Sequence, residues 1–290
     1  MRHRLLHRDD LVTIHDVACR AGRSGPGAEE CAERLTLVLP RRGVFVTHRA
    51  GQEVTADVGR AVLLWPDRPY RVSHPASAGD DCVAIAFEPD ALREVADGAD
   101  DEAAWAVECE PALLHAAQRL RQAVAVRSLD TSAVQELALA MLRAVMDRGR
   151  SVPRARAATS ATRAAQRRIV ETTRQAIAAH SRERLSLADL ARHAGVSRFH
   201  LARTFRRLTA TSVHAHLSRT RLASALERVV AGDGDLTSVA LACGFASHSH
   251  LTHAFRRTFG VPPSSLRTPP AARDIRRMST ILQARSGPSM

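Results

Sequence analysis

The first part of the chain has the hydrophobic pattern of short strands. Between Arg34 and Phe87, apolar residues cluster or alternate with polar ones in brief runs such as RLTLVLP, GVFVTH and CVAIAF. Turn-forming residues separate these runs, among them Pro40, Gly59 and Pro66. Several short strands at this spacing are typical of an antiparallel sandwich or a small barrel. We therefore expect an antiparallel β domain here.

The segments that follow have the period of helices. In PDALREVAD, PALLHAAQRLRQAVAV and TSAVQELALAMLRAVMDR, apolar residues recur three and four positions apart, as on one face of a helix. The last segment, residues 131–148, aligns one apolar stripe made of Val134, Leu137, Met141, Leu142 and Val145. This stripe either packs on the β domain or pairs with the same helix of a second copy, and both alternatives stay open.

Composition then divides the chain into parts. Residues 149–163 are small, polar and basic, which is typical of a linker. The pattern beyond them is helical to about residue 266, and the last stretch opens with two prolines. We expect an α+β protein of two domains. A β domain with following helices spans 1–148, an all-helical domain spans 164–268, and a flexible tail spans 269–290.

Two segments of the helical part resemble each other. One starts at Leu187 and reads LADLARHAGVSRFHLARTFRR, and the other starts at Leu236 and reads LTSVALACGFASHSHLTHAFRR. Each contains a short helical run, a glycine (Gly195 or Gly244), a serine and a second helical run. Glycine easily adopts the positive φ that follows a helix end, and serine is a favoured first residue of a helix. Each copy therefore predicts a helix-turn-helix.

The faces of these helices follow from their period. Ser186 and Asp189 form the pattern of a capping box at the start of the first unit. The second helix of each unit presents an apolar stripe to the core, made of Leu201, Phe205 and Leu208 in the first copy and Leu251 and Phe255 in the second. The opposite stripes are polar and cationic and contain Phe199, Arg203, Arg206, Ser249, His253 and Arg256.

The charge distribution points to a polyanionic partner for the helical part. The chain carries a formal net charge of +12, but residues 1–150 alone sum to −4 and residues 151–290 to +16. Between the two copies, VHAHLSRTRLASALERVV predicts a helix of about 18 residues and about 27 Å. Such a spacer holds two recognition helices about 34 Å apart, which is one turn of DNA. Sequence and charge together predict binding to the major groove of DNA.

On these motifs, residues 169–266 resemble the AraC/XylS family of bacterial transcription regulators. The resemblance implies that the second helix of each unit enters one of two successive major-groove segments. The positions that match the base-reading stretches are Arg198, Phe199, Ala202 and Arg203, and His248, Ser249, Thr252 and His253. The helix-capping serines are Ser197 and Ser247, and the expected phosphate or packing contacts are Arg206, Arg207, Arg256 and Arg257.

The sequence departs from the family pattern at a few positions. Ala210 stands where the family commonly has glycine, as the second copy has at Gly260. His216 and Leu266 stand where an aromatic residue is usual, and His253 stands where arginine is frequent.

The front part is similar to the cupin-like sensor domain of that family. Metal-binding cupins carry three histidines and a glutamate, which His48 and Glu53 echo, but Ala50 and Tyr70 stand where two of the histidines are expected. We therefore expect no metal and no other cofactor, but a barrel that binds a small organic effector. The candidate lining residues are Thr47, His48, Trp65, Tyr70, Arg71 and His74.

The cysteines lack the spacing of a zinc motif. They stand at positions 19, 31, 82, 109 and 243, so that no Cys-x-x-Cys pair occurs. A folded barrel could bring Cys19, His48, His74 and Cys82 together on a metal, but their spacing does not argue for it.

These features favour a transcription regulator over an enzyme. The expected partners are promoter DNA, a small-molecule effector, RNA polymerase, and a second copy bound through the helix around 131–148. The alternative is a metal-dependent cupin enzyme fused to a DNA-binding domain, against which the missing ligands argue. The sequence has neither an apolar run of about 18 residues nor a secretion signal, so we expect a cytoplasmic, nucleoid-associated protein.

Overall fold

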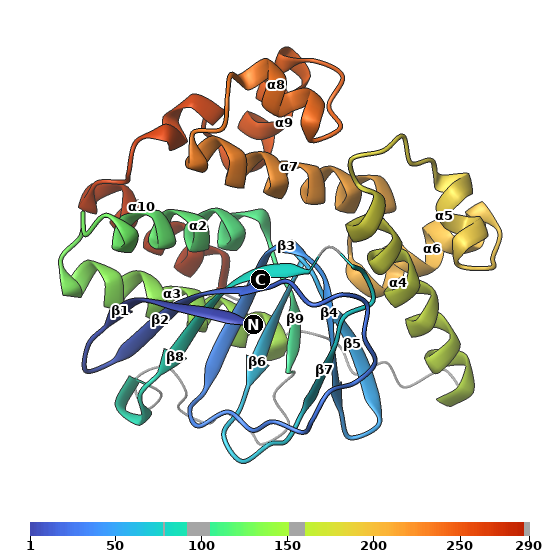
Figure 1. The fold of residues 1–290 in the computed structure, drawn as a ribbon, viewed down its shortest axis with the longest axis horizontal. Coiled ribbons are helices and arrows are strands. Elements are labelled where there is room, and N and C mark those ends of the chain that lie inside the picture. Colours follow the sequence, from blue (N-terminus) through green and yellow to red (C-terminus); the bar gives the residue numbers. More distant parts are fainter. Residues whose placement is uncertain (78, 92–104, 151–159, 287–290) are drawn as a thin grey trace.

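The computed structural model describes residues 1–77, 79–91, 105–150 and 160–286. The front of the chain forms two antiparallel sheets, shown in blue and teal in Figure 1. The larger is six-stranded, in the order β1 (Arg2–Arg8), β2 (Val12–Cys19), β8 (Asp80–Phe87), β3 (Thr36–Gly43), β6 (Arg60–Leu64) and β9 (Ala106–Glu108). The smaller is three-stranded, in the order β5 (Gln52–Ala56), β4 (Phe45–Arg49) and β7 (Arg71–Ser73).

The alternation of side chains gives the large sheet two different faces. Ile14, Leu37 and Ile85 are fully buried on the face that meets the helices. Val17 and Cys82, one position out of phase with them, lie on the opposite face with residues of the small sheet. The expectation of an antiparallel β domain is confirmed.

Three helices cover the outer face of the large sheet. They are α2 (Pro111–Ala125), α3 (Thr131–Arg150) and α10 (Ala272–Ser286). The apolar stripe of residues 131–148 lies on α3, and all five of its residues are buried in the same core cluster as the sheet. Of the two alternatives for this stripe, the structure therefore favours packing within the chain over pairing with a second copy.

The expectation of a flexible tail over 269–290 is wrong for residues 272–286. These residues form α10, which packs along α3 and α2. Ile275 and Leu282 of α10 are buried in the same cluster as the sheet. The two leading prolines do not prevent this, because they precede the helix and the spacing of its apolar residues gives it a face to bury.

The rest of the chain is helical, as expected for the C-terminal domain. It consists of α4 (Ser160–His180), α5 (Leu187–His193), α6 (Arg198–Thr209), α7 (Val213–Ala231), α8 (Leu236–Ala242), α9 (His248–Phe259) and the short 3₁₀ helix η1 (Pro263–Arg267). The predicted linker 149–163 lies outside the described residues over 151–159, and its ends belong to α3 and α4. Among the helices that the structure describes, none is long and apolar enough to span a membrane.

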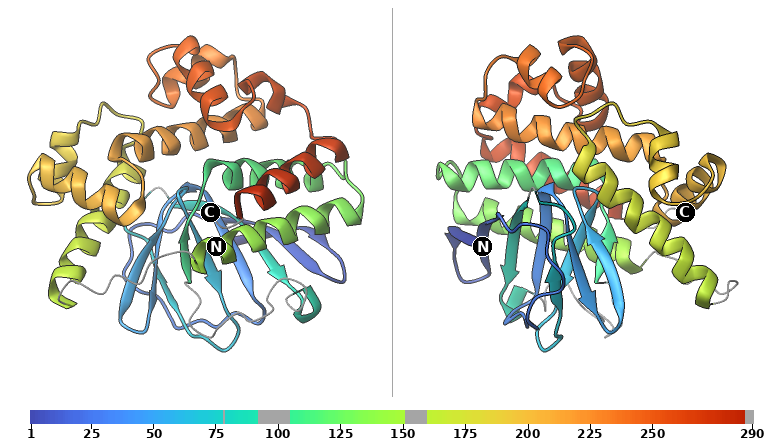
Figure 2. Two further views of the ribbon diagram at one scale, coloured as in Figure 1. Left: turned by 180° about the vertical axis from the view of Figure 1, so that it is seen from behind. Right: turned by 45° about the vertical axis from the view of Figure 1, so that its right-hand side comes forward.

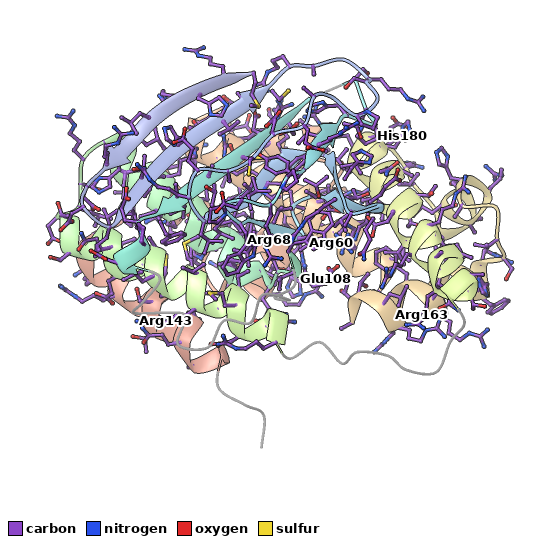
Figure 3. All side chains as sticks on the ribbon, turned by 90° about the horizontal axis from the view of Figure 1, so that it is seen from below. Arg60, Arg68, Glu108, Arg143, Arg163 and His180 are labelled. Atoms are coloured by element: carbon purple, nitrogen blue, oxygen red, sulfur yellow. The ribbon has the colours of Figure 1, made fainter. Side chains whose placement is uncertain are left out.

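The helical domain is anchored on the sheets by buried ion pairs. Arg60 of β6 binds Glu108 of β9 at 2.8 Å and Glu171 of α4 at 2.8 Å. Figure 3 shows Arg60 and Glu108 close together, beside the helices of the C-terminal domain. A second cluster joins Arg41 of β3 to Asp16 of β2 and to Glu227 of α7. The two domains therefore share a charged contact that is largely shielded from solvent.

Candidate DNA interface and effector cavity

The first helix-turn-helix consists of α5 and α6. Ser186 and Asp189 form the expected capping box, in which the Asp189 amide donates to Ser186 Oγ at 3.2 Å. Gly195 follows α5 with a φ of 67°, the left-handed region that glycine tolerates best. Ser197 then caps α6, since its Oγ accepts a hydrogen bond from the His200 amide at 3.2 Å. The sequence prediction for this unit is confirmed.

The second unit, α8 and α9, repeats this construction. Asp235 caps α8 by accepting from the amides of Thr237 and Ser238 at 2.7 and 3.0 Å. Gly244 has a φ of 81°, and a Cβ at this position would lie 3.1 Å from the carbonyl oxygen of Arg182. Ser247 caps α9, accepting from the His250 amide at 3.1 Å.

Each unit has its own core. Leu201 and Phe205 of α6 are fully buried with α4, α5 and the start of α7. Leu251 and Phe255 of α9 are equally buried with α8 and the rest of α7. The assignment of Leu208 to the core is wrong, because its side chain is 42% exposed.

Thr209 takes the buried position in the last turn of α6 instead of Leu208. It is 5% exposed, and its hydroxyl donates to the carbonyl oxygen of Phe205 at 2.8 Å.

The proposed DNA-contacting residues all lie on the molecular surface. Phe199, a large aromatic side chain, is 84% exposed. Two of the positions, Ala202 and Thr252, are partly buried at the edge of their helix face. The others are exposed: Ser197, Arg198, Phe199, Arg203, Arg206, Arg207, Ser247, His248, Ser249, His253, Arg256 and Arg257.

The arginines of this surface differ from those of the interior. Arg41 and Arg174 are buried, Arg60 is largely buried, and each binds carboxylates. Within the described part of the chain, the ion pairs include none of the arginines of α6 and α9, which are Arg198, Arg203, Arg206, Arg207, Arg256 and Arg257. A buried charge must be paired, whereas exposed unpaired guanidinium groups are available to an external anion.

Helix α7 separates the two units. It has 19 residues, which correspond to about 28 Å at the rise of an α-helix. Its first turns pack with α6 through Val213 and Leu217, and its later turns pack with α8 and α9 through Leu226 and Val229. The α5–α6 pair and the α8–α9 pair therefore lie at opposite ends of α7 (Figures 1 and 2).

The departures from the family pattern have local explanations. Ala210 ends α6 with a φ of 56°, the conformation that Gly260 adopts after α9, so the alanine accepts a backbone strain that glycine avoids.

His216 is fully buried, its ring centroid lies 5.5 Å from that of Phe205, and its Nε2 lies 2.9 Å from Asp57 Oδ2. Its imidazole thus fills an aromatic position and also binds the β domain.

The β domain contains a cavity of about 530 Å³ between its two sheets. Of the six candidate lining residues, Thr47, Tyr70 and His74 line it. Tyr70 Oη lies 3.3 Å from Glu30 Oε2, and burial together with this carboxylate raises the pKa of Tyr70 to about 12.

The other three candidates do not line the cavity. His48 Nε2 lies 2.7 Å from Ser73 Oγ, and Trp65 packs on the helix-side core. Arg71 is exposed near Glu29. Sequence reasoning failed here because the register of β4 and β7 decides which face each residue occupies, and a shift of one residue reverses it.

Several lining residues were missed by the sequence analysis. They come from strands β2, β3, β6 and β8 and include Thr13, His15, Val17, Cys19, Val38, Val62, Cys82 and Ala84. In the segment CVAIAF of β8, residues that line the cavity alternate with residues that face the helices. This alternation is visible in the sequence and could have located the lining residues of this strand. Residues 12–19 lie outside the segment in which the sequence pattern predicts strands, which begins at Arg34.

Comparison with known proteins agrees with the double helix-turn-helix. Residues 190–269 match a family described as a helix-turn-helix domain. An AraC-like transcription regulator of Streptomyces lividans is 36% identical over 85 residues, which are 29% of this chain and 28% of that protein. The transcriptional activator AarP of Providencia stuartii is 30% identical over 84 residues, which are 29% of this chain and 62% of AarP. The regulatory protein PocR of Salmonella typhimurium is 31% identical over 91 residues, which are 31% of this chain and 30% of PocR.

Among solved structures, ToxT of Vibrio cholerae aligns with 88% of this chain and 97% of its own, at 12% identity and a TM-score of 0.38. A ToxT structure with bound unsaturated fatty acid aligns with 91% of the chain at 11% identity and a TM-score of 0.40. The family match lies within the helical domain, whose two capped units have the geometry described above. By these matches, residues 190–269 form a helix-turn-helix domain that is similar to the corresponding part of AraC-like transcription regulators.

Proposed function

We propose that the protein is a sequence-specific DNA-binding transcription regulator. Helices α6 and α9 would enter two successive major-groove segments on one face of promoter DNA. Base edges would be read by the exposed residues near the start of each helix, and the arginines of the last turns would meet phosphates. This function implies a cytoplasmic location at the nucleoid.

The observation that carries this proposal is the pairing of two capped, surface-exposed helices at the ends of a spacer of about 28 Å. That spacing is close to one helical turn of DNA. The unpaired arginines of both helices supply the positive charge that a phosphate backbone requires.

We further propose that the cavity of the β domain binds a small organic effector. Its interior is mainly apolar, and polar or charged groups such as Tyr70, His15 and Arg34 stand among its lining residues. Apolar walls with a few convergent polar groups are typical of sites for small molecules. The contacts of α4 and α7 with the β domain would couple this domain to the helices that carry the DNA-binding units.

The alternative of a cupin enzyme receives less support. At the positions of the metal-cupin pattern, His48 lies beside Ser73 and Glu53, and Tyr70, which stands where a histidine is expected, lies beside Glu30. Ala50 lies in a turn with a φ of 48°. These positions therefore do not form the expected ligand set, and the proteins that the chain matches are named for transcription regulation rather than catalysis.

The test is binding of the full chain to the DNA upstream of its own gene, measured by fluorescence anisotropy at graded salt. We expect affinity to fall by orders of magnitude between about 50 and 200 mM salt, because phosphate contacts release counterions. An affinity that does not change with salt contradicts the proposed interface. Unlabelled random DNA of equal length serves as the competitor that separates specific from general binding.

A further inference from the structure

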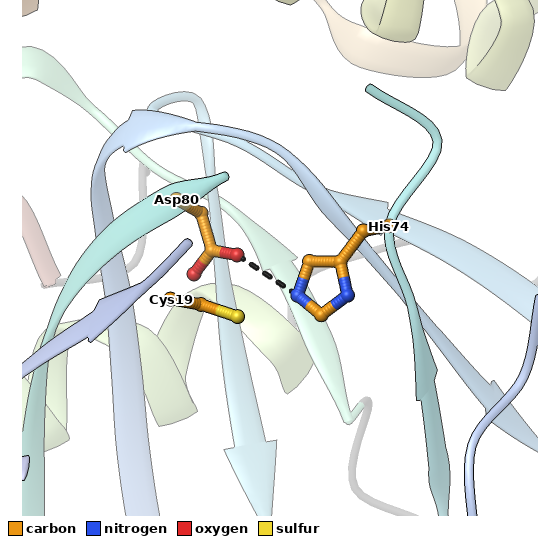
Figure 4. Close-up of side chains that lie close together, drawn as sticks. All are labelled: Cys19, His74 and Asp80. Atoms are coloured by element: carbon orange, nitrogen blue, oxygen red, sulfur yellow. Dashed lines mark ion pairs between the residues drawn. The ribbon is translucent and has the colours of Figure 1, made fainter. Parts of the chain in front are cut away.

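Three metal-binding side chains converge at one end of the cavity, away from the cupin-like positions. Donor atoms of Cys19, His74 and Asp80 all lie within 4.8 Å of one another. His74 Nε2 lies 3.2 Å from Asp80 Oδ1, and the dashed line in Figure 4 marks this ion pair. Cys19 of β2 and Asp80 of β8 are direct cross-strand partners, whereas His74 follows β7 of the small sheet. The cluster therefore joins the two sheets.

The backbone holds these three residues in place. The amide and carbonyl of His74 exchange hydrogen bonds with those of Ser24 at 3.2 and 2.9 Å. His74 Nδ1 also lies 3.5 Å from Ser24 Oγ, so the other ring nitrogen, Nε2, is the one that faces the cluster. Such an outer partner is what orients a metal-binding histidine in known sites. Next to Asp80, Gly79 packs so tightly that a Cβ would lie 2.1 Å from the carbonyl oxygen of Cys19.

Asp80 is poorly compensated for a buried carboxylate. Its side chain is 6% exposed, and its Oδ1, the oxygen that pairs with His74 Nε2, has no further partner among the described residues. Its Oδ2 accepts from the Cys82 thiol at 3.4 Å. The nearby guanidinium groups of Arg20 and Arg42 bind Asp81 instead. A buried anion with so few partners is costly unless a cation compensates it.

We propose that Cys19, His74 and Asp80 bind a divalent metal ion of the zinc type. Thiolate, imidazole and carboxylate are the ligands that Zn²⁺ takes in proteins. All three residues line the cavity, so the fourth coordination position faces it and is open to water or to a donor atom of an effector. The thiol of Cys82, which donates to Asp80, is a second sulfur atom beside the proposed metal site.

A bound metal ion would link β2 and β8 of the large sheet to the segment that follows β7 of the small sheet. The Cys19 thiol loses its proton as its sulfur binds the metal, so binding releases a proton. From the sequence, Cys19 and His74 are among the residues that a folded barrel could bring together on a metal, but Asp80 is not. Positions 19, 74 and 80 have no motif spacing, and it is the β2–β8 register that places Cys19 beside Asp80. The proposal does not depend on DNA binding.

The test uses the full-length protein, stripped of metal with a chelator and kept reduced. Titration with Co²⁺ alone should load one equivalent and produce a thiolate-to-cobalt charge-transfer band, which Zn²⁺ then displaces. Cys19→Ser should lose this band, and His74→Ala and Asp80→Asn should each weaken binding by about 10-fold or more. The matched control is Cys31→Ser, an exposed cysteine of the same domain, which should bind as the wild type does.

Two results would overturn the proposal. One is the lack of stoichiometric binding by the folded wild-type protein, which would leave His74 and Asp80 as a simple ion pair. The other is binding that Cys19→Ser and His74→Ala leave unchanged, which would place the metal elsewhere. If circular dichroism shows that a variant does not fold, X-ray absorption spectroscopy of the zinc-loaded wild-type protein identifies the ligand atoms instead. One or two sulfur ligands together with nitrogen support the site, and zero sulfur ligands refute it.

Discussion

Arg174 of α4 and Asp57, in the turn before β6, form an ion pair that is shielded from water between the two domains. Arg174 Nη1 lies 2.6 Å from Asp57 Oδ1, and the two side chains are 0% and 2% exposed. The other oxygen of Asp57 lies 2.9 Å from Nε2 of His216 on α7. One carboxylate thus binds two helices of the DNA-binding domain to the β domain.

Loss of this carboxylate should destabilise the protein strongly. Burial alone would raise the pKa of Asp57, but Arg174 and His216 outweigh it and hold that pKa far below its usual value. Asp57 therefore contributes fully to the free energy of unfolding above about pH 4, the ordinary pKa of aspartate. This contribution is lost as the pH falls toward the lowered pKa of Asp57 in the folded protein. Asp57→Asn should cost about 3 kcal/mol of unfolding free energy, the low end for a broken buried pair, because Arg174 keeps its contact with Glu108.

Urea unfolding followed by circular dichroism measures this cost. The control is Arg4→Ala, which removes an exposed pair with Asp16 and should cost less than about 1 kcal/mol. Similar small losses in both variants would show that the Asp57 contact does not anchor the domain.

Stability should also depend on the protonation of His115. This histidine of α2 is 8% exposed, and its ring centroid lies 5.5 Å from that of Phe259 in α9. Burial, reinforced by Arg119, lowers its pKa to about 4, below the usual 6.5. Between these values the unfolded chain binds more protons than the folded one, so stability falls as pH is lowered through this window, by at most about 3 kcal/mol.

Replacing His115 by leucine should flatten this part of the pH profile. Burial also lowers the pKa of His15, so the relevant quantity is the difference in slope between wild type and variant. His214, an exposed histidine on α7, provides the control substitution, and His214→Leu should keep the wild-type slope. An unchanged slope in His115→Leu would assign the pH dependence to other groups.

Helix α10 should contribute to the stability of the β domain. Ile275 is fully buried against α3, whereas Ile281 of the same helix is 37% exposed. Ile275→Ala should cost about 2–5 kcal/mol, the range for deleting a buried aliphatic side chain. Ile281→Ala should cost much less. Thermal unfolding distinguishes the two, and equal, small effects would restore the expectation of a flexible tail.

Arg203 should discriminate between DNA sequences. It is exposed on the outer face of α6 and has no ion-pair partner among the described residues. Arg203→Ala should weaken binding to the cognate site by about 1–3 kcal/mol and affect random DNA less. Arg23→Ala removes the same charge from an exposed position of the β domain and should leave both affinities unchanged. An equal loss on both DNAs would make Arg203 a phosphate contact.

The sequence was sufficient where the structure depends on neighbouring residues. The caps Ser186, Ser197 and Ser247 and the turns at Gly195 and Gly244 are set by contacts within a few positions, and all are found as expected. A doubled pattern of this kind also identifies the outward faces of α6 and α9.

The sequence was insufficient where distant segments meet. Asp57, Arg174 and His216 are separated by 117 and 42 positions, and only the packing of α4 and α7 on the sheets brings them together. The cavity lining depends in the same way on strand register, which placed Thr47 inside and its neighbour His48 elsewhere. Periodicity shows that a face is buried but does not show against what.

Footprinting of the full chain on its bound DNA tests the central claim most directly. We expect two protected major-groove segments on one face of the duplex, about 10 base pairs apart. Phe199→Ala together with Arg203→Ala should remove protection of one segment, and Ser249→Ala together with His253→Ala should remove the other. A single continuous footprint, or loss of both segments with either pair of changes, would contradict two helices that read separate groove segments.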